Sequence, residues 1–419
     1  MALPKIIKIR QHFHAPVVEH IEETIAAQLT KTEINERIKP GMRIAVTAGS
    51  RGIANISKII AAVVAELKRR GACPFIVPAM GSHGGATAEG QIEVLESLGV
   101  TEANCGAPII SSMETVQIGN TPEGVPVHMD KYAHEADGVV LIARIKLHTD
   151  FKSPVGIESG LMKMAAIGLG KHRQALLLHT YGVHGIRDIM PEVGKVVIES
   201  GRILFGVGIV ENASEQTAIL EAIEPERIYA REQELLLESA RMYPKLPVED
   251  VDILIVDQIG KNYSGTGMDT NIIGRMRIQG NPEPEQPRIK YIIAGDLSEE
   301  SHGNALGIGL ADLTTLRLTE KIDRKVMNEN VITSTFLQRA SIPIVLDNDR
   351  EALRAALRAN WNVSEDKAKI IRIFSTLHLE HMYVSEAVYE EMRSLPNIST
   401  EGEWETLSFD EFGNLPPFE

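Results

Sequence analysis

Strand, glycine-rich loop and helix alternate along the first half of the chain. The apolar run 42–46 (MRIAV) precedes TAGSRG and the helical stretch ISKIIAAVVAELKRRG, and PFIVPAM precedes GSHGGAT and AEGQIEVLESLG. This order is typical of βαβ units, because parallel strands need a long crossover that is usually a helix. The alternation restarts at residues 251–257 (VDILIVD). The sequence therefore predicts an α/β fold with two domains, each built on a mostly parallel sheet flanked by helices.

The length of 419 residues also favours two domains, because a single hydrophobic core rarely extends so far. Residues 242–250 (MYPKLPVED) contain two prolines and acidic residues, which is typical of a linker. We therefore predict an N-terminal cofactor-binding domain over residues 1–245 and a C-terminal domain over residues 246–419. The acidic tail from Pro396 is expected to be a peripheral extension.

Polar residues follow most of the predicted strands. In open α/β sheets, ligands bind outside the carboxyl ends of the parallel strands. Residues from both domains stand at such ends, so we expect them to converge on an active site in the interdomain cleft. They are Arg51, His83, His148, Gln258, Lys261 and Asp296.

Composition excludes several classes of partner and site. The net charge is −14, from 57 acidic and 43 basic residues, which disfavours nucleic acid and anionic membranes as partners. Cys73 and Cys105 form no CxxC pair, so a disulfide framework, a zinc ribbon and a cysteine-ligated iron–sulfur cluster are not expected. No secretory signal is recognised, and no apolar run reaches the ~18 residues of a membrane span. The predicted location is the cytoplasm.

Residues 146–182 (KLHTDFKSPVGIESGLMKMAAIGLGKHRQALLLHTYG) combine histidines and lysines with glycines and small apolar residues. Lys163 stands among apolar neighbours, where the charged form is penalised and the amine becomes a better nucleophile. His148 follows an apolar strand and is either an acid–base group or a turn histidine. His179 ends the apolar run ALLLH and is either a ligand or a core histidine satisfied by the backbone; His172 and His184 compete with it.

Two glycine-rich loops in the N-terminal half are candidate ligand sites. TAGSRG presents the backbone of Gly49 and Ser50 and the forked donor of Arg51, a combination that suits a phosphate or carboxylate. The alternative is a tight strand-to-helix turn with an exposed arginine. GSHGG places His83 where a ligand can approach closely, as a general base, a metal ligand or a turn histidine.

A third such loop, QIGKNYSGTGMD, lies in the C-terminal half. It carries Gln258 and Lys261 and either holds a substrate carboxylate and hydroxyl or is a surface loop.

Taken in order, these residues resemble the lactate racemase family that uses a nickel-pincer nucleotide. The family has an arginine after the first strand, a Gly-x-His turn after the second, and a further histidine after a later strand. These features are matched by Arg51, by the turn that holds His83, and by His148. A tethering lysine, a nickel-ligating histidine sixteen residues later and a Gln-x-x-Lys complete the series. Their matches are Lys163, His179, Gln258 and Lys261.

The resemblance implies an isomerase that inverts the α-carbon of a 2-hydroxy acid through reversible hydride transfer. Lys163 would carry the covalently tethered nickel-pincer nucleotide, near Gly49 and Ser50, and His179 would ligate the nickel. His83 and His148 would be the two acid–base groups. Arg51, Gln258 and Lys261 would hold the substrate carboxylate and oxygen. Enzymes of cofactor biosynthesis would be transient partners.

Some positions depart from the family pattern. Ala48 and Gly52 stand where lactate racemases have aspartate and proline, and Gly84 follows His83 where they have arginine. The interval from His148 to Lys163 is also longer. These departures favour a 2-hydroxy acid other than lactate, such as a larger acid or a sugar acid. Two other readings remain open: a cofactor-free lyase or isomerase that uses the same histidines, and a non-catalytic protein that binds hydroxy acids.

Overall fold

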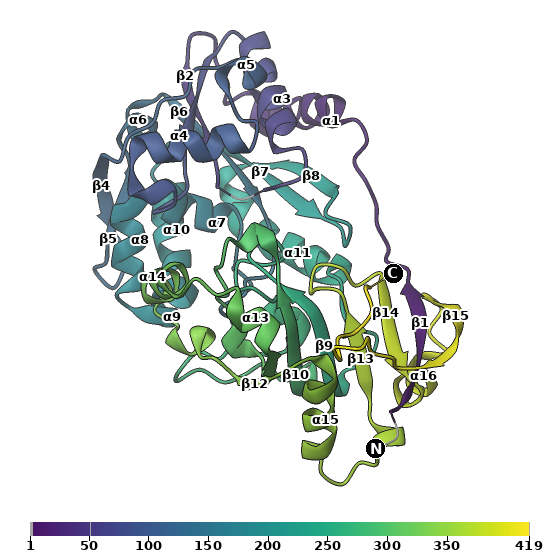
Figure 1. Cartoon of the computed structure of the whole chain (residues 1–419). Coiled ribbons are helices and arrows are strands. Elements are labelled where there is room, and N and C mark those ends of the chain that lie inside the picture. The colour runs from purple at the N-terminus through teal and green to yellow at the C-terminus, as the bar shows by residue number, and fades with distance from the viewer. Residues whose placement is uncertain (1–2, 51, 419) are drawn as a thin grey trace. The chain divides into compact units, whose positions relative to one another are not determined.

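The computed structural model describes residues 3–50 and 52–418, which form two compact units (Figure 1). The N-terminal unit runs from His14 to Tyr243, and the C-terminal unit holds the residues up to Phe13 and from Pro244 onward. The predicted boundary at residues 245–246 lies beside this division. The first strand, β1 (Lys5–Gln11), nevertheless belongs to the C-terminal unit, where it pairs with strands near the end of the chain.

The N-terminal unit is built on a five-stranded sheet in the order β3-β2-β6-β7-β8. Its strands are β2 (Arg43–Ala48), β3 (Cys73–Pro78), β6 (Gly138–Arg144), β7 (Ile203–Glu211) and β8 (Thr217–Ile223). All neighbouring pairs are parallel except β7 and β8. β3 lies on one side of β2 and β6 on the other, so the strand order reverses at β2. Such a reversal is where open α/β sheets bind ligands. A separate antiparallel pair joins β4 (Thr115–Asn120) to β5 (Pro126–Asp130).

Helices cover both faces of this sheet. Val139 and Leu141 of β6 pack into one hydrophobic core and Val140 and Ile142 into the other, as expected for strands buried on both sides. The first core includes α7, α10 and α11, and the second includes α1 and α3. The helices are α1 (Ile21–Leu29), α2 (Thr32–Asn35), α3 (Ile56–Arg69), α4 (Ala88–Ser97), α5 (Glu102–Cys105), α6 (Lys131–Glu135), α7 (Leu161–Lys163), α8 (Lys171–His179), α9 (Gly182–His184), α10 (Met190–Glu199) and α11 (Pro225–Met242), with π-helical turns η2 (Met164–Gly168) and η3 (Gly185–Ile189).

The C-terminal unit contains an eight-stranded sheet in the order β12-β11-β10-β9-β13-β14-β1-β15. The strands from β12 to β13 in this order are parallel, and β14, β1 and β15 continue the sheet antiparallel. Their bounds are β9 (Asp250–Ile259), β10 (Arg288–Leu297), β11 (Leu313–Thr315), β12 (Ile344–Leu346), β13 (Ile370–Ile373), β14 (His381–Ser385) and β15 (Ile398–Thr406); the helices are α12 (Thr270–Ile273), α13 (Leu316–Glu320), α14 (Arg324–Ser334), α15 (Asp349–Ala359) and α16 (Glu386–Met392). The predicted α/β fold with a mostly parallel sheet in each of two units is confirmed.

The acidic tail lies at the edge of the C-terminal sheet. Residues 398–406 form β15 and pair with β1. Further on, Leu415 donates its backbone N–H to Asp349 at 2.9 Å, and Arg372 donates to the carbonyl of Pro416. The tail is therefore part of the C-terminal unit.

Candidate active site

The carboxyl ends of β2, β3 and β6 border a cavity of about 180 Å3 in the N-terminal unit. Its lining includes Gly49 and Ser50 after β2, His83 after β3, Arg144 at the end of β6 and Lys163 at the end of α7. The structure thus brings four predicted site residues together at the point where the strand order reverses. Arg51 lies outside the described residues.

His83 is held in a tight turn beyond β3. Its Nδ1 shares a hydrogen bond with the hydroxyl of Ser50, so the loops after β2 and β3 meet at this ring. Gly84 has a φ of +66° and leaves no space for a side chain, since a Cβ there would lie 2.5 Å from the carbonyl carbon of Gly90. The amide of Gln91 donates to the carbonyls of Gly81 and His83 at 3.0 and 3.2 Å. Both faces of the turn are therefore fixed.

His148 reaches the same place from the loop after β6. Its ring stacks on Phe151, with centroids 4.4 Å apart, and its Nε2 lies 2.7 Å from Nζ of Lys163. The buried carboxylate of Glu158 accepts the backbone N–H groups of His148 at 2.6 Å and Ser153 at 3.1 Å. Burial raises the pKa of Glu158, while Lys152 and these two N–H groups oppose that shift. Glu158 thus organises the loop that presents His148.

The contacts of His148 orient its ring toward Lys163. Its Nδ1 accepts the backbone N–H of Asp150 at 3.1 Å, so the proton of a neutral ring lies on Nε2. Nε2 faces Nζ of Lys163 across a hydrogen bond of 2.7 Å. The amine of Lys163 is thus placed beside an imidazole at the cavity, and its role as a nucleophile stays a prediction.

A second buried carboxylate fixes the segment that carries Lys163. Glu232 of α11 is 1 % exposed and accepts the backbone N–H of Met162 at 2.8 Å. Burial raises its pKa to about 7, against the opposing hydrogen bonds from Met162 and Leu161. Gly160 is required here, because a Cβ would lie 2.5 Å from the carboxyl carbon of Glu232.

His179 is the last residue of α8 and its side chain is exposed. Desolvation by the surrounding protein lowers its pKa first and the charge of Lys163 second, while Asp150 opposes the shift. A lowered pKa keeps the imidazole neutral near pH 7, the form that ligates metals. Within residues 3–50 and 52–418, no three or more His, Cys, Asp or Glu side chains are grouped to hold a metal ion.

Gln258 and Lys261 lie at and just after the end of β9 in the C-terminal unit. Gln258 accepts a 2.7 Å hydrogen bond from the hydroxyl of Tyr263, which orients its amide. Tyr263 packs edge-on against Phe374 and His378, which follow β13. β9 and β13 are neighbours at the strand reversal of this second sheet. The convergence of these residues with the N-terminal cavity in an interdomain cleft stays a prediction.

Comparisons with known proteins identify a related family. Residues 5–183 match the family described as Lactate racemase N-terminal domain. This part of the chain is therefore similar to the N-terminal domain of lactate racemases. Its structure is similar to that of the lactate racemase apoprotein from Thermoanaerobacterium thermosaccharolyticum, with a TM-score of 0.51, 12 % identity, and coverage of 88 % of this chain and 94 % of that chain. That likeness confirms the fold, and no curated protein matches the sequence significantly.

The predicted isomerase class of this lactate racemase-like protein is confirmed by the family match. The matched residues 5–183 include the six predicted site residues that the structure describes in the N-terminal unit; these are Gly49, Ser50, His83, His148, Lys163 and His179. No helix in the described part of the chain is long and apolar enough to cross a membrane.

Sequence reasoning missed Arg144, which lines the cavity of this lactate racemase-like protein. The residue stands inside the apolar run GVVLIARIKL, whose pattern predicts a strand and no separate role for the arginine. Its guanidinium pairs with Glu211 of β7, which also accepts the backbone N–H of Ala54 at 2.7 Å. The signal was available, because a lone arginine at the end of a buried strand needs a partner.

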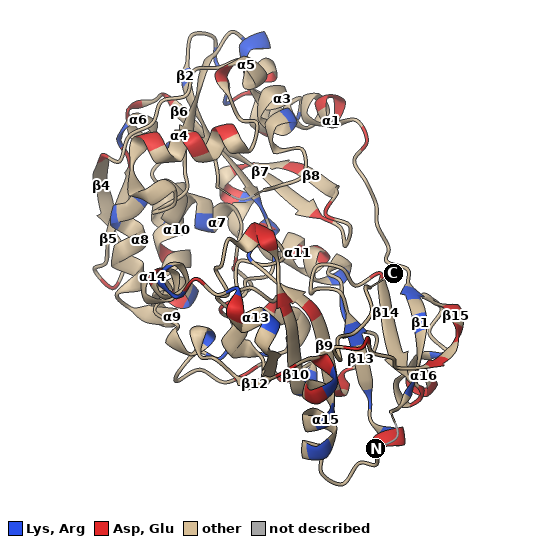
Figure 2. Ribbon diagram, viewed as in Figure 1, with Lys and Arg blue, Asp and Glu red and all other residues tan. Residues whose placement is uncertain are grey.

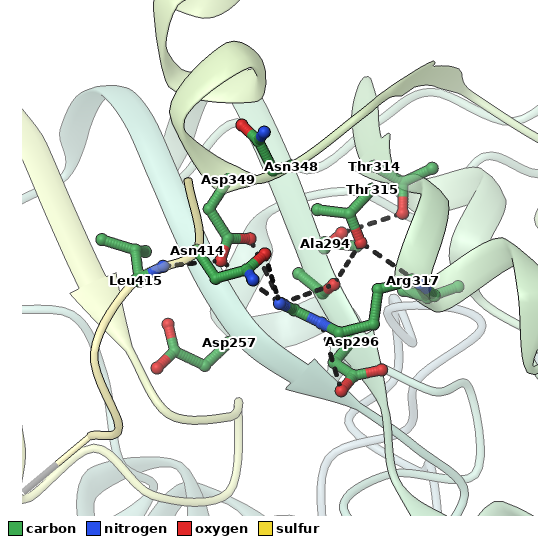
Figure 3. Close-up of polar contacts among 12 residues, drawn as sticks. Asp257, Ala294, Asp296, Thr314, Thr315, Arg317, Asn348, Asp349, Asn414 and Leu415 are labelled. Carbon is green, nitrogen blue, oxygen red and sulfur yellow. Dashed lines mark hydrogen bonds and ion pairs between the residues drawn. The ribbon is translucent and has the colours of Figure 1, made fainter. Parts of the chain in front are cut away.

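Asp296 has a different environment from the cavity residues. It is the penultimate residue of β10, near the strand end as expected from the sequence, but its carboxylate lies 2.8 Å from Lys321 and 3.3 Å from Nε of Arg317. Figure 3 shows Arg317 between Asp296 and Asp349. Asp296 is therefore part of an ion-pair network within the C-terminal unit.

Proposed function

We propose that this protein is a racemase or epimerase that inverts the α-carbon of a 2-hydroxy acid with a nickel-pincer nucleotide tethered at Lys163. The observation that carries the proposal is the placement of Lys163. Its amine lines the cavity with His83 and contacts His148 at 2.7 Å, so one nucleophile stands beside both acid–base candidates. The substrate is a small molecule, and the enzymes that build the cofactor are transient partners.

The residues around the cavity fit such a group in their chemistry. An unprotonated lysine amine can form the amide-type tether, and a neutral imidazole at His179 is a suitable nickel ligand alongside soft sulfur donors. Gly49 and Ser50 offer a loop at the end of β2 for a nucleotide phosphate. Gly49 also approaches η2 closely, since a Cβ there would lie 3.2 Å from Met164.

The histidines divide the proton transfers between them. When bound, the nucleotide supplies a hydride acceptor that side chains lack. One of His83 and His148 takes the hydroxyl proton as the α-hydrogen leaves, and the other serves the opposite enantiomer. The hydroxyl of Ser50 orients His83, and Glu158 holds the backbone of His148. Two bases on separate loops suit the two faces of one substrate.

The substrate carboxylate requires cationic or amide donors. We assign this role to Arg51, Gln258 and Lys261. Ala48, Gly52 and Gly84 replace larger or charged residues of lactate racemases around the N-terminal loops. Smaller side chains leave room for a larger acid, such as a sugar acid.

One observation favours a second candidate function. His148 and Lys163 already form an acid–base pair, which can abstract an α-proton without any cofactor. A cofactor-free lyase or isomerase would use this pair directly.

Isotope retention distinguishes the two functions. Protein produced with the cofactor-forming enzymes is analysed by intact mass and nickel content, and is then assayed with single enantiomers of α-deuterated 2-hydroxy acids. We expect racemisation with deuterium retained at the α-carbon, together with a mass increase that is lost in Lys163→Ala. The matched control is Lys195→Ala, a surface lysine paired with Glu192 in the same unit. Racemisation in protein without nickel, with loss of deuterium to water, would establish the cofactor-free alternative instead.

A further inference from the structure

Lys171 is a buried lysine that the proposed chemistry does not use. It begins α8 and is 0 % exposed, as is its partner Asp130 at the end of β5. Its Nζ lies 3.3 Å from the carboxylate of Asp130 and donates to the side-chain oxygen of Gln91 at 3.1 Å. It also donates to the carbonyl of Pro78, the last residue of β3. One ammonium group therefore joins three separate segments.

Packing alone does not account for this lysine. Burial lowers the pKa of Lys171 and raises that of Asp130, while their mutual attraction opposes both shifts. Buried ion pairs of this kind are often no more stable than apolar residues of the same volume. Lys171 also has a φ of +54°, which is unfavourable for a residue with a side chain. Both the buried charge and the backbone conformation of Lys171 are therefore unfavourable for folding.

The contacts of Gln91 connect this cluster to the active site. Because its side-chain oxygen accepts from Lys171, its amide nitrogen faces the turn after β3. That nitrogen donates to the carbonyls of Gly81 and His83 at 3.0 and 3.2 Å. The path from Lys171 to His83 thus consists of two consecutive hydrogen bonds through a side chain that is 0 % exposed.

Lys171 also belongs to the helix that ends in His179. Its neighbour Gly170 fits tightly, since a Cβ there would lie 2.3 Å from Gln174 and 2.4 Å from the carbonyl of Ala166. Gln174 in turn accepts the backbone N–H of His128 at 2.9 Å. The start of α8 is therefore fixed by buried polar contacts on several sides.

We propose that Lys171 is a positioning residue that sets the place of His83 relative to the helix bearing His179, acting through Gln91 and the carbonyl of Pro78. The inference rests on the proposed function only in giving His83 and His179 their catalytic roles. The mechanical coupling itself concerns the cofactor-free protein, so it can be tested apart from the reaction.

The test separates stability from positioning. Lys171→Met leaves Asp130 buried without its cation. The urea midpoint of this variant is therefore expected to fall. The double variant Lys171→Met/Asp130→Leu removes both charges and is expected to recover most of that loss. Gln91→Met removes only the side-chain amide that connects Lys171 to the turn holding His83. Lys131→Met removes a surface ion pair with Glu114 and is the matched control.

The readout is the NMR signal of the His83 ring in full-length protein with 13C-labelled histidine. This signal is assigned by comparison with His83→Asn. We expect the His83 titration midpoint to shift, and hydrogen exchange of residues 81–84 to accelerate roughly tenfold or more, in both the double variant and Gln91→Met. Lys131→Met should match the wild type.

A stable double variant with a wild-type His83 titration and wild-type exchange would overturn the proposal. If the double variant does not fold, unchanged His83 behaviour in Gln91→Met would overturn it equally. In nickel-loaded protein, the kcat of Gln91→Met should fall about tenfold or more with little change in KM, as misplacement of a catalytic group predicts. Absence of racemase activity in all proteins, with the His83 signals shifted, would reject the proposed function and leave the positioning role intact.

Discussion

The two sheets end in polar residues of very different character. In the N-terminal unit, the strand ends border a cavity, and His83 and His148 are each held by a few hydrogen bonds. In the C-terminal unit, carboxylates at the same kind of position are enclosed in ion pairs. Asp257 binds Arg372 at 2.7 Å, and Asp296 lies between Lys321 and Arg317. Acidic and basic residues lie close together around β10 and α13 (Figure 2).

This difference indicates that a polar residue at the end of a strand is not by itself evidence for a catalytic site. A carboxylate that receives a bidentate guanidinium has its lone pairs occupied and its charge balanced. Such a group stabilises its surroundings but is poorly suited to exchange protons. A histidine beside a cavity can change its protonation state near neutral pH with little rearrangement. The ion pairs of the C-terminal network thus fit a structural role, whereas the N-terminal cluster is where we propose the chemistry.

The largest effect on stability is expected from Arg372→Met. Arg372 is 3 % exposed and is the bidentate partner of Asp257. Burial raises the pKa of Asp257 and Arg372 opposes that shift, so loss of the guanidinium leaves an uncompensated buried carboxylate. We expect about 3–5 kcal/mol lower free energy of unfolding for the transition of the C-terminal unit. Urea denaturation at pH 7 measures the effect.

The matched control is Arg288→Met. Arg288 pairs with Asp250 in the same unit, but both side chains are well exposed, at 61 % and 50 % respectively. Exposed pairs contribute about 0–1 kcal/mol, so this variant should stay near the wild type. Equal effects of the two substitutions would remove the distinction between a buried network and surface pairing.

Much of the fold follows from local sequence patterns, because strand and helix periodicity is encoded within short windows. The apolar runs gave the strands β2, β3, β6 and β9, and the glycine-rich loops between them gave the strand ends where His83 and His148 stand. Pairing between distant segments has no such local signal. This is why β1 and the acidic tail were not placed together in the C-terminal sheet.

The candidate site was predicted less completely. Histidines and a lysine in apolar surroundings are unusual enough to be noticed. Lys171, Glu158 and Glu232 were not singled out, because a charged residue is normally at the surface. Only the tertiary structure reveals that Glu158 and Glu232 hold backbone N–H groups beside His148 and Lys163.

Glu232 provides an intermediate test, because it is a buried acid of the N-terminal unit with no guanidinium to balance it among the described residues. Its pKa is raised from 4.5 to about 7 in the folded protein. The folded state therefore holds a proton that the unfolded chain releases near pH 4.5. The stabilisation from this proton is complete below pH 4.5 and is lost as the pH rises through 7. The difference corresponds to about 3 kcal/mol.

Glu232→Gln should remove that pH dependence. We expect the free energy of unfolding of the variant to gain about 3 kcal/mol relative to the wild type between pH 4.5 and pH 8, measured by urea denaturation at intervals of one pH unit. Glu234→Gln, on the same helix and exposed, is the control. Parallel pH profiles for the wild type and Glu232→Gln would mean that the carboxylate is ionised in the folded state throughout.

The smallest effect is expected from Ser50→Ala, and it concerns activity rather than stability. Ser50 shares one hydrogen bond with Nδ1 of His83 and lines the cavity. Such a bond contributes about 0.5–1.5 kcal/mol, which corresponds to roughly a 2- to 12-fold lower kcat in the loaded enzyme. The urea midpoint should change little. Ser57→Ala, which loses a 2.8 Å hydrogen bond to the carbonyl of Gly99 in the same unit, should leave kcat unchanged.

The two measurements on Ser50→Ala bear directly on the contrast between the units. A lower kcat with an unchanged urea midpoint fits a site whose polar contacts orient reactive groups. A large loss of stability with unchanged kcat would instead place Ser50 and His83 in the same class as Arg372 and Asp257, as a contact that holds the fold. The strand ends of the N-terminal unit would then be structural too, and the acid–base role would rest on His148 and Lys163 alone.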